Sequence, residues 1–390
     1  MQDESRALVS LERARLRVLH VSQPAEAGVA RCVLSLIADQ LARGWEVSLA
    51  APAWGTLTAE AESLGADCHV WVAARSPGPA TISEARSLGA IVRKVEPDLV
   101  HLHSSKAGLG GRLWIRGRLP TVFQPHAWSF EATGRALGAA ARAWERLASR
   151  WADAIVCVSE AEAARGASLG IQHERYRVIP NGIALEDWNV GQRADARREL
   201  GLRDGPLALC VGRLSRQKGQ DLLLAAWPAV RAGVPGAQLV LVGSGLEEER
   251  IRALADEDVR VVGARDDLVD WYGAADVVVL PSRWEGMSLV PLEAMACGRS
   301  VVATDVDGVR EAIGNEAGAV VPAGDTGALA TAVAERLGDS ELADAEGRAG
   351  RRRVESSFGI QETAAAFAAL YEELVALREP ASSSTAPTIP

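Results

Sequence analysis

The chain of 390 residues lacks the segments that mark membrane and secreted proteins. No run of eighteen or more apolar residues occurs, so a helix that spans a bilayer is not expected. The N-terminal segments M-Q-D-E-S-R and L-E-R-A-R-L-R are polar or basic and contain no apolar signal-peptide core. Together with a length typical of two domains, these absences predict a large cytoplasmic protein.

Cysteines are few and scattered. The thiols stand at positions 32, 68, 157, 210 and 297, an odd number without C-x-x-C spacing. Most fall in predicted strands or helices, so we expect small core residues in a reducing compartment. No group of cysteine, histidine and carboxylate residues has the spacing of metal ligands, so no metal is expected, and no other cofactor.

A basic surface for nucleic acid is also absent. The formal net charge is −9, with 21 basic and 20 acidic residues in 1–190 but 21 basic and 31 acidic residues in 191–390. An acidic C-terminal half argues against a nucleic-acid binder, which carries a basic footprint.

The sequence does contain two series of short apolar runs separated by helical segments such as 32–43 and 135–151. The runs lie at 18–21, 47–51, 99–102, 122–124, 155–158 and 178–179, and then at 208–211, 239–242, 259–262, 277–280, 301–303 and 319–321. Such alternation predicts parallel sheets with helices on both faces. The expected fold class is α/β, with two Rossmann-like doubly wound domains in series.

The expected domains are 1–190 and 191–356, joined near 186–205. An amphipathic helix at 361–378 fills most of the segment 357–379, and the residues 380–390 are predicted to be a disordered tail.

The most informative segment is E-G-M-S-L-V-P-L-E-A-M-A, which begins at Glu285 and contains Glu293. It follows the apolar run 277–280, and Pro291 suits the first turn of a helix. The backbone N–H groups of 288–290 would then form an anion site at the helix N-terminus. An anion flanked by carboxylates that accept hydrogen bonds from hydroxyls outlines a sugar-nucleotide site. Taken alone, the segment also fits a buried turn with two incidental glutamates.

Two cations follow the strand predicted at 207–211. Arg213 and Lys218 leave the end of this strand beside Gly212 and Gly219. The planar guanidinium and the mobile ammonium suit the oxygens of a diphosphate. Both this loop and the glutamate segment lie at carboxyl ends of predicted parallel strands, where open α/β sheets bind ligands.

Further motifs complete an ordered set. The first half carries A-G-V-A-R at 27–31, P-H-A-W at 125–128, V-S-E at 158–160 and I-P-N-G-I at 179–183. The second half carries V-G-R-L at 211–214, K-G at 218–219, V-G-S-G at 242–245 and the paired glutamates. In this order, over nearly its whole length, the chain resembles the retaining glycosyltransferases of family 4 (glycosyl transferases group 1). The resemblance implies the GT-B fold, with its two domains facing a central cleft and a C-terminal helix that crosses back to the first domain.

The resemblance also implies roles for the matching residues. Arg213 and Lys218 would hold the donor diphosphate, Glu293 would bind the ribose, and Glu285 would face the transferred sugar. The implied catalytic residues are Glu285, His126, Arg213 and Lys218. The implied donor-binding residues are Gly28, Arg213, Lys218, Gly243, Gly286, Met287, Ser288, Leu289, Val290 and Glu293. On the acceptor side they are His103, Ser104 and Asn181.

Some residues depart from the family pattern or need another interpretation. Ala27 stands where the family usually has a second glycine, and a positive φ there would be strained. Asp305 and Asp307 form a D-x-D like the metal motif of a different glycosyltransferase fold, but they follow a late strand, and we interpret them as a loop. His101 is interpreted as a packed residue, because no third metal ligand is evident beside His103.

The predicted function is transfer of a hexose from a UDP- or GDP-sugar to a hydroxyl of a glycan, glycolipid or metabolite, in bacterial cell-surface polysaccharide or glycoconjugate synthesis. A sugar-nucleotide 2-epimerase and a non-catalytic sugar-nucleotide-binding protein are the alternatives. An NAD-dependent oxidoreductase is disfavoured, because the G-x-G-x-x-G pattern fails after Gly243 and after Gly108.

The acceptor side has a bearing on location. The basic, tryptophan-bearing segments 106–118 and 135–151 suit contact with anionic lipid, which would place the protein peripherally on the inner face of the membrane. Ordinary sheet-covering helices with solvated arginines fit these segments equally well.

Overall fold

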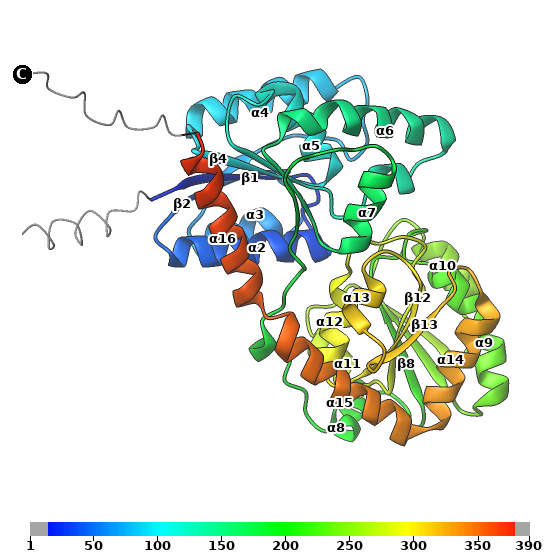
Figure 1. Cartoon of the computed structure of the whole chain (residues 1–390). Coiled ribbons are helices and arrows are strands. Elements are labelled where there is room, and N and C mark those ends of the chain that lie inside the picture. Colours follow the sequence, from blue (N-terminus) through cyan, green and yellow to red (C-terminus); the bar gives the residue numbers. More distant parts are fainter. Residues whose placement is uncertain (1–14, 379–390) are drawn as a thin grey trace, which may run out of the picture.

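A computed structural model describes residues 15–378, which form two parallel β-sheets with helices packed around each (Figure 1). Within these residues one sheet has seven strands and the other six, and neighbouring strands run parallel. The predicted α/β class with two Rossmann-like sheets is confirmed.

The first sheet comes from the N-terminal half. In spatial order its strands are β3 (Asp67–Val70), β2 (Glu46–Ala51), β1 (Arg17–Ser22), β4 (Leu99–His103), β5 (Thr121–Gln124), β6 (Ala154–Cys157) and β7 (Tyr176–Val178). The helices are α2 (Ala27–Ala42), α3 (Leu57–Leu64), α4 (Thr81–Val95), α5 (Ser104–Ile115), α6 (Arg135–Ala148) and α7 (Glu160–Ser168), with 3₁₀ turns η1 (Ser129–Glu131) and η2 (Ser149–Trp151).

The second sheet comes from the C-terminal half. Its strands, in spatial order, are β10 (Val259–Gly263), β9 (Gln238–Val242), β8 (Leu207–Val211), β11 (Val277–Leu280), β12 (Ser300–Thr304) and β13 (Gly318–Val321). After the turn η3 (Leu185–Asp187), the helices are α8 (Arg193–Glu199), α9 (Gln220–Gly233), α10 (Glu248–Leu254), α11 (Leu268–Ala274), α12 (Leu289–Ala296), α13 (Val309–Ile313), α14 (Thr326–Gly338), α15 (Ser340–Ser357) and α16 (Ile360–Ala376).

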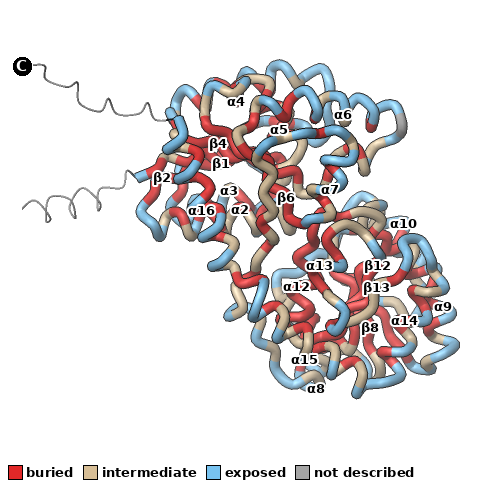
Figure 2. The backbone as a smooth tube through the Cα atoms, in the orientation of Figure 1, coloured by how far each residue is buried: buried red, intermediate tan, exposed pale blue. Residues whose placement is uncertain are grey.

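The central strands explain why the apolar runs are continuous rather than alternating. Every residue of β4, β8 and β11 is buried (Figure 2). Helices cover both faces of a parallel sheet, so both sets of side chains along each strand leave water.

Helix α16 ties the end of the chain to the first sheet, and it runs beside α2 in Figure 1. Its residues Phe367, Leu370 and Tyr371 share one buried core with Val18 and Ile37. The burial of this apolar stripe holds the helix on the N-terminal half. The predicted crossover helix is confirmed.

Several boundaries differ from the prediction. β3 was not predicted, because D-C-H-V is short and partly exposed, as expected of an edge strand. β7 begins at Tyr176, α2 begins at Ala27 instead of residue 32, and α6 ends at Ala148 before η2. The tail predicted at 380–390 lies outside the described residues, and the domain boundaries stay predictions.

The basic helices considered for lipid contact send part of their charge inward. Lys106 pairs with Glu84, and Arg112 pairs with Glu145 at 2.7 Å between Nη2 and Oε2, with all four side chains buried. Two of the cations in 106–118 therefore neutralise carboxylates in the core. Among the described residues, no helix is both long and apolar enough to cross a bilayer.

Ala27 gives a test of local strain. Its φ is +60°, a conformation that costs an alanine about 1–2 kcal/mol, while a glycine there loses about 0.5–1 kcal/mol of chain entropy. We expect Ala27→Gly to stabilise the protein by about 0.5–1 kcal/mol in urea unfolding. The matched control is Ala38→Gly, at an exposed site within the same helix, which should destabilise it by about 1 kcal/mol. Equal losses in both variants would contradict the strain.

Candidate active site

The loop after β11 enters α12 as the motif predicts. Ser288 caps the helix, and its hydroxyl oxygen accepts a hydrogen bond from the backbone N–H of Val290 at 3.4 Å. Pro291 lies in the first turn, where a missing N–H costs no intrahelical bond. The remaining free N–H groups of this turn carry partial positive charge, which favours an anion.

Glu285 is buried and held by two donors. Lys218 Nζ lies 2.6 Å from its Oε1, and Ser282 donates to the same oxygen at 2.7 Å. Lys218 also lies 3.4 Å from the hydroxyl of Ser288 at the N-cap of α12. Lys218, which was predicted to bind the diphosphate, therefore directly contacts Glu285, which was predicted to face the sugar.

Glu293 is a buried carboxylate with partners from both halves of the chain. Its side chain is 1% exposed, forms an ion pair with Arg31 of α2, and accepts a hydrogen bond from the hydroxyl of Tyr272 at 2.6 Å. The sequence-based candidates missed both partners. Arg31 closes the motif A-G-V-A-R, which was the available signal, whereas Tyr272 belongs to no motif.

Arg213 stands apart from these pairs. Its side chain is exposed, but neighbouring atoms remove part of the surrounding water, and this partial loss of solvent lowers the pKa of the guanidinium. The nearby Arg75 of the N-terminal half lowers the pKa further, while Glu285 and Glu26 oppose the shift. A guanidinium keeps its charge in proteins, so Arg213 and Arg75 repel each other across the two halves. Such a pair gains from binding an anion between them.

Glycines let the loops approach one another. Gly243 has a φ of +146°, and a Cβ there would lie 2.0 Å from the carbonyl oxygen of Gly212. On the other side, a Cβ at Gly28 would lie 3.8 Å from the side chain of Leu289, the first residue of α12. Both predicted glycines therefore border the N-terminal end of α12 or the Arg213 loop.

His126 occupies a strained turn after β5. Its φ is +53° and that of Ala127 is +87°. The Glu162 carboxylate holds the turn, because it accepts hydrogen bonds from the backbone N–H of Ala127 at 2.6 Å and of Val158 at 2.8 Å. Burial raises the pKa of Glu162 to about 7. The S-x-x-E spacing of Ser159 and Glu162, typical of a capping box, is the signal that could have found this residue.

The three acceptor-side candidates have different surroundings. His103 is fully buried and contacts His126, so its side chain does not line an open surface. Ser104 begins α5 with a φ of +71°. Asn181 donates from Nδ2 to the carbonyl oxygen of Met287 at 2.8 Å and so connects the two halves.

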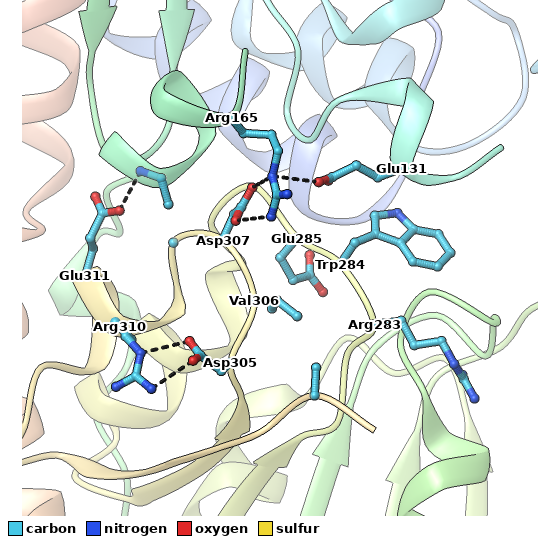
Figure 3. A pocket seen from close by; sticks show the side chains of 13 residues that line it. Glu131, Arg165, Arg283, Trp284, Glu285, Asp305, Val306, Asp307, Arg310 and Glu311 are labelled. Carbon is cyan, nitrogen blue, oxygen red and sulfur yellow. Dashed lines mark hydrogen bonds and ion pairs between the residues drawn. The ribbon is translucent and has the colours of Figure 1, made fainter. Parts of the chain in front are cut away.

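A cleft of about 480 Å³ lies between the halves beside Glu285 (Figure 3). Arg165 lies 3.4 Å from Glu131 and 3.2 Å from Asp307, and Arg310 pairs with Asp305 at 2.8 Å. Each carboxylate of the D-x-D thus has an arginine partner, as expected of a loop rather than a metal site. Trp284 adds an aromatic face to this charged cleft.

Two family patterns match the chain, Glycosyltransferase Family 4 over residues 27–187 and Glycosyl transferases group 1 over residues 205–339. A lipopolysaccharide core biosynthesis mannosyltransferase of Rhizobium meliloti (strain 1021) is 30% identical over 305 residues, covering 71% of this chain and 84% of that protein. The chain belongs to glycosyltransferase family 4. Membership makes it a nucleotide-sugar-dependent, retaining hexosyltransferase, as the family resemblance implied.

Other relatives and solved structures agree on the family and fold. A GDP-mannose-dependent monoacylated alpha-(1-6)-phosphatidylinositol monomannoside mannosyltransferase of Corynebacterium glutamicum is 33% identical over 222 residues, covering 53% of this chain and 58% of that protein. Sucrose-phosphate synthase from Thermosynechococcus elongatus superposes with a TM-score of 0.81 and 26% identity, over 93% of this chain and 100% of that one. HepE of Anabaena with UDP-glucose has a TM-score of 0.81 at 21% identity, over 92% of this chain and 100% of that one, which shows the fold alone.

Gly286→Ala should separate the two halves at the site. A Cβ at 286 would lie 2.8 Å from the backbone nitrogen of Ala127 in the His126 turn and 3.0 Å from the Glu162 carboxylate, which holds that turn from α7. A misplacement of about 1 Å costs about a hundredfold in rate, so kcat/KM should fall by about that factor. Gly273→Ala is the control, because its added Cβ meets no atom closer than 3.6 Å. Steady-state kinetics in which both variants match the unaltered enzyme would contradict this close contact.

Proposed function

We propose that this glycosyltransferase transfers mannose from GDP-mannose to a hydroxyl of a glycan or lipid-linked acceptor in the synthesis of a cell-surface glycoconjugate. The observation that carries the proposal is the convergence of Arg213, Lys218, the N-terminus of α12 and two buried carboxylates. The choice of donor is supported by relatives, which are named mannosyltransferases, one of them GDP-mannose-dependent.

The diphosphate is proposed to bind between Arg213, Lys218 and the N-terminus of α12. The glycosidic bond breaks with positive charge growing at the anomeric carbon and negative charge on the diphosphate. Cations fixed in place before the reaction stabilise that negative charge without transfer of a proton. Arg75 lies close enough to Arg213 to contribute to the same field.

The two glutamates are proposed to bind the ends of the donor. Glu293 keeps lone pairs beyond those used by Arg31 and Tyr272, and it would accept hydrogen bonds from ribose hydroxyls. Glu285 would face the mannose, with Lys218 shared between this carboxylate and the diphosphate. The backbone from Gly286 to Val290 completes the proposed donor site.

The cleft of Figure 3 is the proposed acceptor site. Carboxylates of Glu131 and Asp307 and the indole of Trp284 suit a polyhydroxylated molecule, since hydroxyls donate to carboxylates and sugar rings pack on aromatic faces. The relative from Corynebacterium is named for a phosphatidylinositol monomannoside acceptor, and a lipid acceptor here would bring the enzyme to the inner face of the membrane.

A thermal-shift panel tests the donor. GDP-mannose at a hundred times its Kd should stabilise the protein by about 2.7 kcal/mol, whereas UDP-, ADP- and dTDP-sugars should stabilise it less. A shift with UDP-sugars and none with GDP-mannose would overturn the donor assignment. Consumption of the donor without acceptor, with formation of its C2 epimer, would instead show the 2-epimerase alternative.

Arg213→Ala should lower kcat by about a hundredfold to a thousandfold, because it removes one fixed charge at the developing anion. Arg213 is exposed and lies outside the two hydrophobic clusters that pack around the second sheet. Its loss should therefore change the thermal unfolding temperature little. Arg216→Ala, at another exposed arginine of the same loop, is the matched control and should leave the kinetics unchanged. If both variants lose activity equally, the loss reflects loop charge, and the diphosphate assignment of Arg213 is wrong.

A further inference from the structure

Four histidines gather in the first sheet behind the proposed sugar site. His20 lies on β1 and pairs in register with His101 on β4, and His103 lies two residues further along β4 on the same face. His126 follows β5, the next strand of the sheet. Because β1, β4 and β5 are neighbouring parallel strands, the four rings lie close together toward the carboxyl ends of these strands.

Three of these rings form a continuous hydrogen-bonded chain that starts at Gln40. The Oε1 of Gln40 lies 2.9 Å from Nε2 of His20, and Nδ1 of His20 lies 2.9 Å from Nε2 of His103. Nδ1 of His103 then lies 3.2 Å from Nε2 of His126. The rings of His103 and His126 stack with their centroids 5.5 Å apart.

The hydrogen bonds in this series of side chains all run in one direction. A carbonyl oxygen only accepts, so His20 donates to Gln40 from Nε2. Burial lowers the pKa of His20 to about 4, that of His126 to about 3 and that of His103 well below its usual range, so each ring is neutral and carries one proton. Nδ1 of His20 must then accept from His103, and Nδ1 of His103 must accept from His126.

Helix α16 packs a tyrosine beside the amide at the start of the hydrogen-bonded chain. Tyr371 interacts with the side chain of Gln40, and its hydroxyl lies 2.5 Å from Nδ1 of His101. Because the carbonyl oxygen of Gln40 faces Nε2 of His20, the NH₂ group of Gln40 is the part of the amide left for Tyr371. A flipped amide would reverse every bond in the chain.

We propose that Gln40, His20 and His103 are positioning residues that hold His126 as the Nε2–H tautomer. Its Nδ1 atom, which has no hydrogen-bond partner in the described part of the chain, is then an acceptor for a hydroxyl of the sugar. This inference rests on the proposed place of His126 beside the donor sugar. The adjacent Ala127 already contacts the Gly286 loop of the donor half, which supports that place.

A metal ion is the other occupant that such a cluster suggests. Ligand nitrogens of His20, His101 and His103 lie within 4.8 Å of one another, so the structure supplies the third residue that the sequence did not reveal. Both ring nitrogens of His20 and of His103 are already hydrogen-bonded. Within residues 15–378, His101 Nε2 is the cluster nitrogen left buried and unpartnered. The bonds observed therefore favour the hydrogen-bonded chain over a metal site.

Nitrogen-15 NMR of histidine side chains tests the tautomers directly. The chain has six histidines, and His173 is an internal reference, because its Nε2 lies 3.0 Å from the carbonyl oxygen of Ala152 and its Nδ1 accepts from the N–H of Arg175. We expect His126 to show the Nε2–H pattern of His173. Scalar couplings should also appear across the N–H···N bonds that join His126 to His103 and His103 to His20. An Nδ1–H tautomer at His126, or stoichiometric zinc retained after dialysis, would overturn the proposal.

Gln40→Leu removes the acceptor at the far end of the chain. His126 should then show a mixture of tautomers, and kcat should fall about fivefold to tenfold, the value of one hydrogen bond. Gln238→Leu is the control, because it removes a similarly buried glutamine from the second sheet and should leave the His126 signals unchanged. Tyr371→Phe, which deletes only a hydroxyl, serves as a second variant and should shift His126 in the same direction.

The two hypotheses fail separately. A His126 signal that stays pure Nε2–H in both Gln40→Leu and Tyr371→Phe would overturn the positioning role, whatever the kinetics. Absence of turnover with every nucleotide sugar would overturn the proposed function, while the tautomers of the unaltered protein would still decide the inference.

Discussion

The close approach of the two halves at Gly286 is the constraint on which the site depends. Its carbonyl oxygen accepts a hydrogen bond from Ser159 at 3.0 Å, and the next carbonyl, that of Met287, accepts one from Asn181 at 2.8 Å. These contacts join the loop that carries Glu285 to the ends of the first sheet. Any side chain larger than hydrogen at 286 would enter the His126 turn and move the C-terminal half away from it.

Charge inside the site is largely paired before any substrate binds. Glu293 is matched by Arg31 and Glu285 by Lys218, so neither buried carboxylate is left uncompensated. An unpaired buried charge would cost several kcal/mol. Arg213 and Arg75 are the exception, two like charges whose repulsion a diphosphate would relieve. This repulsion between two arginines would favour an anion with two charges, such as the proposed diphosphate.

Backbone strain gathers after the carboxyl ends of neighbouring strands in the first sheet. Ala27 follows β1, Ser104 follows β4, and His126 and Ala127 follow β5, and all four have a positive φ. Each such residue costs of the order of 1–3 kcal/mol and persists only where its surroundings hold it. Glu162 does so for the His126 turn through two backbone hydrogen bonds. Three neighbouring strands of the first sheet therefore lead into strained backbone.

The sequence by itself determined the two parallel sheets, because continuous apolar runs and the Gly and Pro residues that end them are local signals. It also singled out Glu285, Glu293, Arg213 and Lys218 as candidate site residues, because these residues lie in motifs of fixed spacing. The family and the fold of the protein, which are both confirmed, followed from the same motifs.

Only the tertiary structure decided which residues complete the site. Arg31 meets Glu293 across 262 positions, and His101 meets Tyr371 across 270. The hydrogen-bonded rings from Gln40 to His126 likewise depend on β1, β4 and β5 lying side by side, although β2 and β3 separate β1 from β4 along the sequence. Such partners are set by strand order and by the packing of one half on the other, and no local pattern of residues records either.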